Sequence, residues 1–308
     1  MLEELGPLLN NLPPKTAGAL VQAINRCGRE LGIGPEWIRR WIAFTVVADG
    51  LAHYAPDGER MFDLKGGAAI EMRLRRFAPG AGETDEAGGA KFRPRATRDL
   101  DATFRGTLNG LENAVRTALA EPRHRFAFRV VGEKTEAPMM RRMTVHVTYQ
   151  EERFGRLQEK AFSNVQLEIS TYEGVYREPE MVPAFSLKPF GIDGPEKLPC
   201  LPLKKQIAQK LHAVTIHSQD GRSNDRFRDL LDILMLSGLA PPTPELREIC
   251  EETFRIREQQ PWPPEIIAHS HWIEPMEQRA AEMGLPQETA DEIVRQVVEY
   301  VRAIATVA

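Results

Sequence analysis

Two aspartates and a pair of glycines are the residues of this sequence whose types and spacing could do chemistry together. Residues 95–104 are typical of a strand that carries Asp99 and Asp101. Because a strand turns successive side chains to opposite faces, both aspartates point to one side of it and Leu100 points into the core. Two carboxylates on one face form a hard-oxygen site that suits Mg²⁺ and phosphate.

The glycine pair supplies a complementary anion-binding element. Residues 62–70 predict a short strand, a turn at Gly66 and Gly67, and the start of a helix. Bare backbone at a helix N-terminus offers N–H groups to anionic oxygens. Each feature alone is common, because Gly-Gly turns join many elements and an Asp-x-Asp is often an Asx turn or a solvated strand edge. The Gly- and Pro-rich residues 77–94 predict a surface loop beside the site.

The composition is that of an ordinary soluble protein. The 308 residues are 42% hydrophobic and 27% charged, which allows two domains with a core each. No apolar run approaches the ~20 residues needed to cross a bilayer, and the first five residues are acidic where a signal peptide is basic. We therefore expect a cytoplasmic protein. Cys27, Cys200 and Cys250 lack metal-like spacing and are expected to be buried or half-buried thiols.

The net charge of −4 conceals an uneven distribution of charge. Residues 91–156 contain 14 Lys and Arg against 8 Asp and Glu, whereas residues 243–308 contain 6 against 13. A basic region around the aspartates would attract a polyanion, and the acidic C-terminal region would not. The alternative interpretation of the basic region is a set of solvated strand faces.

Hydrophobic periodicity predicts an α+β fold. Helical spacing covers residues 15–31, 35–53, 107–120, 203–214, 224–234 and 287–306. Alternating polar and apolar residues predict strands over 125–133, 141–150 and 161–172, in a mostly antiparallel sheet. The six prolines and three glycines of residues 173–202 predict an extended surface linker.

The order of these elements indicates three parts. Residues 1–56 are expected to form a helical buttress, in which Trp37 and Trp41 pack into the core. Residues 57–190 carry the aspartates, the glycine pair and the predicted sheet. Residues 191–308 are predicted to form a helical C-terminal domain.

The last predicted strand holds a candidate third acid. Val165, Leu167 and Ile169 share one face of this strand and leave Glu168 on the other. This strand therefore carries a carboxylate on its polar face, and the resemblance described below implies a role for it at a metal site. A strand glutamate that simply faces solvent is the alternative.

Two C-terminal helices carry charged residues in unusual places. Lys210 lies on the apolar face of the first helix, where it either extends its amine to solvent or reaches a buried anion. In the second helix Asp225, Asp229 and Asp232 gather on the side opposite the apolar residues. Like charges on one face repel one another unless cations neutralise them, and the neighbouring arginines could form such ion pairs locally.

Together these motifs resemble the AbiEii toxin family, a group with AbiGii-type and MenT-like members among the polymerase-beta-like nucleotidyltransferases. The family combines a Leu-Lys-Gly-Gly motif, an Arg-x-Ser/Thr-x-Asp-x-Asp motif, a helix with a lysine, and a helix with Asp-x-x-Asp. The matching residues here are Leu64 to Gly67, Arg95 to Asp101, Lys210, and Asp229 to Asp232. Four motifs in this order, over residues 64–234, are far more specific than any one of them.

The resemblance implies a fold and an activity. The fold would be a mixed sheet flanked by helices, followed by an all-helical C-terminal domain. The activity would be a toxin's transfer of a nucleoside monophosphate from a nucleoside triphosphate to the 3′ end of tRNA, with Mg²⁺ or Mn²⁺, which blocks translation until a cognate antitoxin neutralises it. The implied catalytic residues are Asp99, Asp101, Lys210 and Asp229; the metal ligands Asp99, Asp101 and Glu168; the nucleotide-binding residues Lys65, Gly66, Gly67, Arg95 and Thr97.

Two other functions fit the same residues. An enzyme of this fold could modify another acceptor, such as a protein hydroxyl, a small-molecule hydroxyl or a different RNA. Alternatively, the chain could bind nucleotides without turnover and act by interaction. The presence of all four implied catalytic residues argues against the second alternative, because a decayed site has no chemical reason to keep them.

Overall fold

The computed structural model describes residues 13–74, 97–137, 140–216, 224–285 and 289–307, and of residues 133–137 only the backbone. These residues belong to two compact units. The first contains residues 13–74, 97–172 and 181–200, and the second contains residues 173–180 together with the described residues from 201 onwards. Each unit is treated separately below.

A seven-stranded sheet forms the centre of the first unit. Its spatial order is β3-β4-β5-β2-β1-β7-β6. The strands are β1 (Phe62–Lys65), β2 (Asp99–Phe104), β3 (Phe126–Ala137), β4 (Met140–Arg153), β5 (Arg156–Thr171), β6 (Glu180–Pro183) and β7 (Lys197–Cys200). Strand β2 is antiparallel to β1 and parallel to β5, and β4 is antiparallel to both of its neighbours, β3 and β5. The mixed sheet predicted from the resemblance is therefore confirmed.

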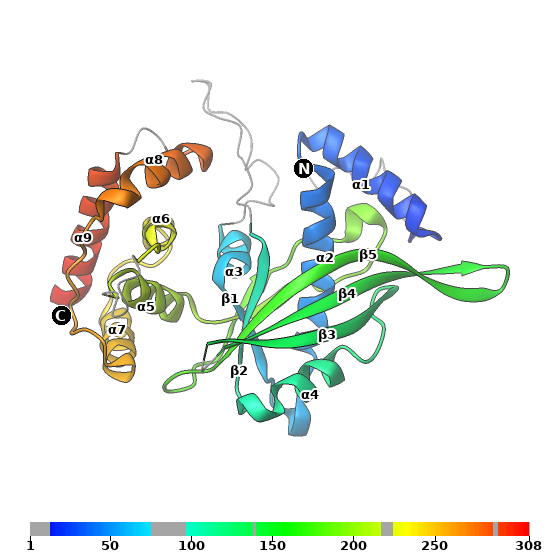
Figure 1. The fold of residues 1–308 in the computed structure, drawn as a ribbon, viewed down its shortest axis with the longest axis horizontal. Helices are drawn as coiled ribbons and strands as arrows, with labels where there is room; N and C mark the ends of the chain where they lie inside the picture. The colour runs from blue at the N-terminus through cyan, green and yellow to red at the C-terminus, as the bar shows by residue number, and fades with distance from the viewer. Residues whose placement is uncertain (1–12, 75–96, 138–139, 217–223, 286–288, 308) are drawn as a thin grey trace. The chain divides into compact units, whose positions relative to one another are not determined.

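Four helices accompany this sheet (Figure 1): α1 (Ala17–Leu31), α2 (Pro35–Ala52), α3 (Gly66–Arg73) and α4 (Leu108–Ala118). Helix α1 begins where the Thr16 side chain accepts a hydrogen bond from the Ala19 N–H, and it ends at Gly32 with a left-handed backbone. Helix α2 begins with Pro35 and is buried over most of its length, because it packs against β1, β5 and β7. Trp41 is 2% exposed, which confirms its predicted place in the core.

The prediction of an extended linker over residues 173–202 is wrong from residue 180 onwards. Strands β6 and β7 join the sheet there, and β7 pairs with the central strand β1. Between them Phe185 and Phe190 are buried and stack on each other, with a ring separation of 6.3 Å. The prolines dominate the sequence pattern, but the large apolar side chains between them provide enough buried area to hold the segment in the core.

From residue 201 onwards, the secondary structure elements described in the second unit are helices. It contains α5 (Leu203–Val214), α6 (Phe227–Ser237), α7 (Pro244–Arg257), α8 (Ile273–Glu282) and α9 (Ala290–Thr306). Helix α5 packs on α6 and α7, and α6 also packs on α8 and α9. The predicted helical C-terminal region is thus confirmed. Among the residues described, no helix combines the length and the apolar character needed to span a membrane. All three cysteines are buried, as expected.

Candidate functional site

The two predicted carboxylates stand in the middle of the sheet. Strand β2 begins at Asp99, and its register places Asp101 between Lys65 of β1 and Glu168 of β5. Both aspartates are partly exposed, whereas Leu100 between them is 1% exposed. The alternation therefore directs both aspartates to one face of the sheet, the face that also carries Glu168.

The Gly-Gly turn packs directly on Asp101 and on Thr97. Gly66 has a φ of +62°, and a Cβ added to it would lie 2.0 Å from Asp101 Oδ2. A Cβ on Gly67 would lie 2.9 Å from Thr97 Oγ1. Only glycine combines the left-handed backbone with so close an approach. The N-terminus of α3 is thereby held against the carboxylate of Asp101.

Two basic side chains flank the carboxylates within the sheet. Lys65 Nζ donates a 2.6 Å hydrogen bond to Ser170 Oγ, two residues beyond Glu168 on β5. Arg142 of β4 donates to Glu168 Oε1 from Nε, at 2.8 Å, and from Nη2. Arg142 and Ser170 are absent from the sites predicted by sequence. Arg142 lies opposite Glu168 in the register of β4 and β5, which the alternation of the two strands alone does not determine.

The electrostatics of the site favour a bound cation. Burial raises the pKa of Asp99 above its usual value, and the negative charge of Glu168 raises it further. The positive charges of Arg142, Arg98 and Arg40 act in the opposite direction. Carboxylates that repel one another and offer hard oxygens are the donor chemistry that a divalent metal ion requires. The residues present therefore fit such an ion at Asp99 and Asp101.

A ready-made three-ligand centre is not formed. In the described ranges, no group of three or more Asp, Glu, His or Cys side chains is arranged to hold a metal ion. Glu168 instead accepts its hydrogen bonds from Arg142. Its assignment as a metal ligand stays a prediction.

Thr97 has a hydroxyl group suited to an anionic ligand. The residue is 8% exposed, and its Oγ1 has no hydrogen-bond partner among the described residues. Its carbonyl oxygen accepts a 3.1 Å hydrogen bond from Arg40 of α2, which fixes the backbone just before β2. Arg95, the other residue predicted here for nucleotide binding, lies outside the described residues, as does the predicted loop over 77–94.

In the second unit Lys210 is held between two carboxylates. Its Nζ lies 2.6 Å from Asp229 Oδ1 and 2.7 Å from Asp232 Oδ2. Asp229 is 8% exposed and Asp232 only 1%. Lys210 therefore reaches a buried anionic pair, the second of the two alternatives for its side chain. Asp232 is missing from the predicted site, although the Asp-x-x-Asp spacing on α6 signals that both acids share a face.

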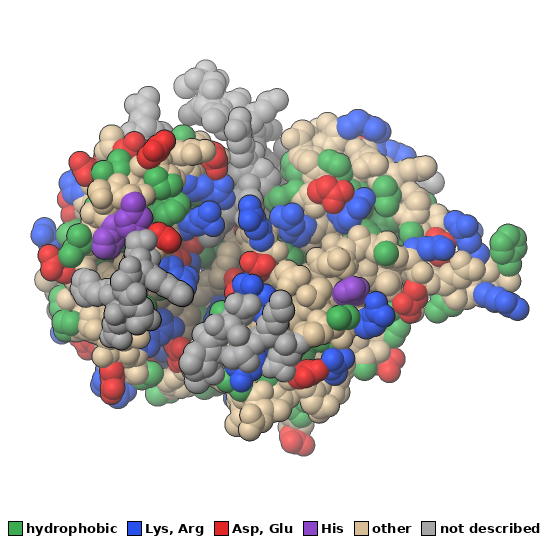
Figure 2. Space-filling view, viewed as in Figure 1, with side chains coloured by type: hydrophobic (Ala, Val, Ile, Leu, Met, Phe, Trp, Pro, Cys, Tyr) green, Lys and Arg blue, Asp and Glu red, His purple; other side chains and the backbone are tan. Residues whose placement is uncertain are grey.

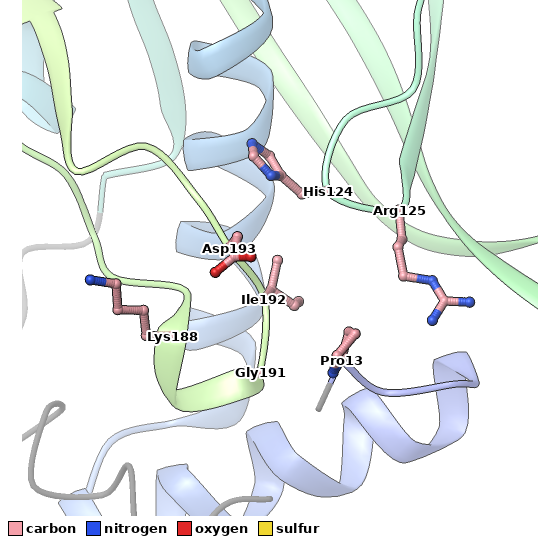
Figure 3. A pocket seen from close by; sticks show the side chains of 7 residues that line it. All are labelled: Pro13, His124, Arg125, Lys188, Gly191, Ile192 and Asp193. Carbon is pink, nitrogen blue, oxygen red and sulfur yellow. The ribbon is translucent and has the colours of Figure 1, made fainter. Parts of the chain in front are cut away.

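A cavity of about 490 Å³ lies elsewhere in the first unit (Figure 3). It is lined by His124, Arg125, Lys188 and residues 191–193, together with Pro13. His124 Nε2 lies 3.0 Å from Asp49 Oδ2, so the imidazole is anchored to a buried acid. The predicted site residues do not line this cavity.

The mixed sheet, the glycine turn and the paired aspartates form the arrangement that the resemblance to nucleotidyltransferases predicts. The family model of the nucleotidyl transferase AbiEii toxin, of the type IV toxin–antitoxin system, matches residues 51–300. The chain therefore belongs to the AbiEii family of nucleotidyltransferase toxins, which confirms the resemblance and the predicted enzyme class.

Comparison with curated proteins gave no match. Among solved structures, JHP933 from Helicobacter pylori is 16% identical, with 86% of this chain and 95% of that chain covered and a TM-score of 0.38. The nucleotidyltransferase toxin MenT4 (Rv2826c) from Mycobacterium tuberculosis H37Rv is 15% identical, with 86% and 93% covered and a TM-score of 0.41.

Proposed function

We propose that this nucleotidyltransferase transfers a nucleoside monophosphate from a nucleoside triphosphate to the 3′ end of tRNA in a metal-dependent reaction. The observation that supports this proposal best is the packing of Gly66 on the carboxylate of Asp101. It brings a phosphate-binding backbone and a metal-binding carboxylate to one place. A structural turn has no need of that combination.

The triphosphate is proposed to bind along the start of α3. Gly66 and Gly67 expose the backbone N–H groups there, since neither carries a side chain that would cover them. The hydroxyl of Thr97, which has no partner among the residues that the structure describes, lies beside Gly67 and can donate to a phosphate oxygen. Lys65 adds a positive charge, and Arg95 joins the set through its place in the family motif.

Asp99 and Asp101 are proposed to hold Mg²⁺ or Mn²⁺, and Glu168 is the candidate third carboxylate. The bound ion would neutralise charge that develops on the transferred phosphate. The chain's own part is to keep both aspartates ionised and fixed. Gly66 limits the movement of Asp101, and three arginines counteract the raised pKa of Asp99.

Lys210 is proposed to stabilise the phosphates as a compact positive charge. Asp229 and Asp232 hold its amine in one position, at 2.6 and 2.7 Å. In the transfer the acceptor oxygen bonds to the α-phosphorus, pyrophosphate leaves, and the hydroxyl proton passes to a base. Because Asp229 is in short contact with Lys210, we favour a role for Asp229 in positioning Lys210 over a role as the base that accepts the hydroxyl proton.

The acceptor and the partner protein are proposed from the family. Type IV toxins are paired with an antitoxin, so we propose a cognate antitoxin that neutralises this chain. The basic balance of residues 91–156 favours a polyanionic acceptor such as tRNA.

The acceptor is identified by incubating the intact chain with each of four α-³²P-labelled nucleoside triphosphates, Mg²⁺ and total tRNA. Lys210→Ala should abolish labelling of tRNA, whereas Lys197→Ala, which removes an exposed lysine, should leave it unchanged. Label on a protein or a small molecule instead of tRNA would show that the acceptor is wrong. Triphosphate binding without any transfer would favour the alternative that the chain binds nucleotides without turnover and acts by interaction.

A further inference from the structure

One face of the sheet continues from the two aspartates onto β5, β4 and β3. The register aligns Asp99 with Gln166 of β5 and Gln166 with Thr144 of β4. Gln166 and Thr144 are hydrogen bonded to each other across the strands, at 3.1 Å from Nε2 to Oγ1. The buried residues of β4 and β5 alternate with these and point to the opposite face, where α2 packs. The polar face is turned towards the viewer in Figure 1, with α2 behind the strands.

The next row of residues on this face borders a surface hollow. Two residues before Gln166, Asn164 is aligned with His146 of β4, and His146 with Arg129 of β3. These three residues, with Thr148 and Ser163, line a hollow of about 520 Å³. Figure 2 shows a histidine beside a Lys or Arg side chain on the face of the molecule turned towards the viewer.

The residues that line the hollow include those of a β-bulge. The pairing of β4 with β5 shifts between Val147 and Thr148, where Val147 is opposite Ser163 and Thr148 is opposite Ala161. The extra residue, Phe162, turns into the core, where it is 7% exposed and packs edge-on against Phe126 at 5.1 Å. A bulge re-aims side chains locally and is a common device beside functional sites.

The polar groups of the hollow suit a single-stranded nucleic acid. Arg129 is exposed, and its Nη2 lies 3.5 Å from His146 Nδ1, so both basic side chains face the same space. Asn164 is exposed and offers an amide that can donate to and accept from a base edge. Glu159, at the far end, accepts a 2.9 Å hydrogen bond from Thr148.

The hollow lies close to the aspartates. Two residues along a strand span about 6.6 Å, and neighbouring strands are about 4.8 Å apart. Asn164 therefore lies about 6.6 Å along β5 from Gln166. Gln166 is the register partner of Asp99 on the neighbouring strand. A chain bound in the hollow can reach the aspartates within about one nucleotide.

We propose that this hollow binds the RNA acceptor strand next to its reactive 3′ hydroxyl, with Arg129 on a phosphate and Asn164 on a base. The inference rests on the proposed function, since it assigns the acceptor's place beside Asp99 and Asp101. RNA is favoured over a protein acceptor because the lining combines the guanidinium of Arg129 with imidazole, amide and hydroxyl groups on the aspartates' own face.

Transfer to tRNA is measured for the intact chain, Arg129→Gln, Asn164→Ala and the matched control Arg156→Gln. Arg156 is an exposed arginine of the same hairpin that does not line the hollow. Arg129→Gln should raise KM for tRNA about tenfold and leave KM for the triphosphate unchanged. It should also reduce the slope of log RNA affinity against log salt concentration by roughly one, which corresponds to the loss of one phosphate contact. This affinity is measured without triphosphate. Asn164→Ala should raise KM for tRNA less.

Equal behaviour of Arg129→Gln and Arg156→Gln in both assays would overturn the inference while leaving tRNA transfer established. If the intact chain labels no tRNA, the proposed acceptor is wrong. The binding assay then still tests whether the hollow binds RNA. Weaker RNA binding by Arg129→Gln alone supports it, and unchanged RNA binding refutes it. Label on a protein acceptor that is insensitive to Arg129→Gln would also overturn it.

Discussion

Replacing Gly66 with alanine should separate the chemistry of the site from the stability of the fold. The new Cβ would lie 2.0 Å from Asp101 Oδ2 and 2.9 Å from Asp101 Cβ, whereas ordinary contact begins at 3.4 Å. A rotation of the carboxylate alone cannot relieve the second contact, so the backbone of the turn or of β2 must shift by several tenths of an ångström or more. Displacements of about 1 Å at reacting groups cost roughly 10²-fold in rate. We therefore predict a loss of kcat of about 10²-fold.

The left-handed backbone of Gly66 also costs an alanine about 1–2 kcal/mol of stability. Gly32→Ala is the matched control, because Gly32 has a φ of +65° and no neighbour within 4 Å of an added Cβ. Gly32→Ala should lose about this free energy of unfolding in urea titrations and keep nucleotide transfer. Gly66→Ala should lose at least as much, because its Cβ also contacts Asp101, and only this variant should lose nucleotide transfer. Full transfer activity in a folded Gly66→Ala variant would refute the placement of Asp101 in the reaction.

Three further results are expected. Asp232→Asn should lower kcat by about tenfold with a native unfolding curve, because it frees one side of the Lys210 amine; an unchanged kcat would remove Asp232 from the site. Glu168→Gln should raise the Mg²⁺ concentration for half-maximal transfer and Arg142→Gln should lower it, since the guanidinium competes with the ion for this carboxylate; identical midpoints would exclude Glu168 as a ligand. Burial, and then a nearby arginine, lowers the pKa of His212 from 6.5 to about 4. The unfolded chain therefore binds more protons between these values, and the free energy of unfolding should fall by at most about 3 kcal/mol as pH drops from 6.5 to 4, a fall that His212→Gln should lessen.

The sequence was sufficient for elements whose pattern is local. Helix α2 could be predicted because Pro35 marks its start and apolar residues recur along it, and β4 because its polar and apolar residues alternate. The direction of Asp99 and Asp101 also followed from alternation alone. Strand β7 could not be predicted, because four residues that include Pro199 carry too short a pattern, and their pairing with β1 is set by distant packing.

The candidate site was predictable in its residue types and less so in its partners. Lys210 and Asp229 were chosen from helix faces and the family motif, and they meet within the second unit. The pairing of Glu168 with Arg142 was missed, because it depends on the register between two strands, which turn geometry and the bulge at Val147 determine. Asp232 was missed because burial of an ionised acid is expected only where a cation pairs with it, and its pairing with Lys210 became visible only in the structure.

The central claim is tested most directly by the rate of α-³²P transfer from a nucleoside triphosphate in the presence of Mg²⁺, with γ-³²P-labelled triphosphate as the control for the transferred group. Asp101→Asn is compared with Asp193→Asn, which makes the same change at an exposed aspartate. The account predicts transfer of the α-label by the intact chain and by Asp193→Asn, no transfer of the γ-label, and a loss of at least 10²-fold in folded Asp101→Asn. Equal rates of α-label transfer in the two variants would contradict it.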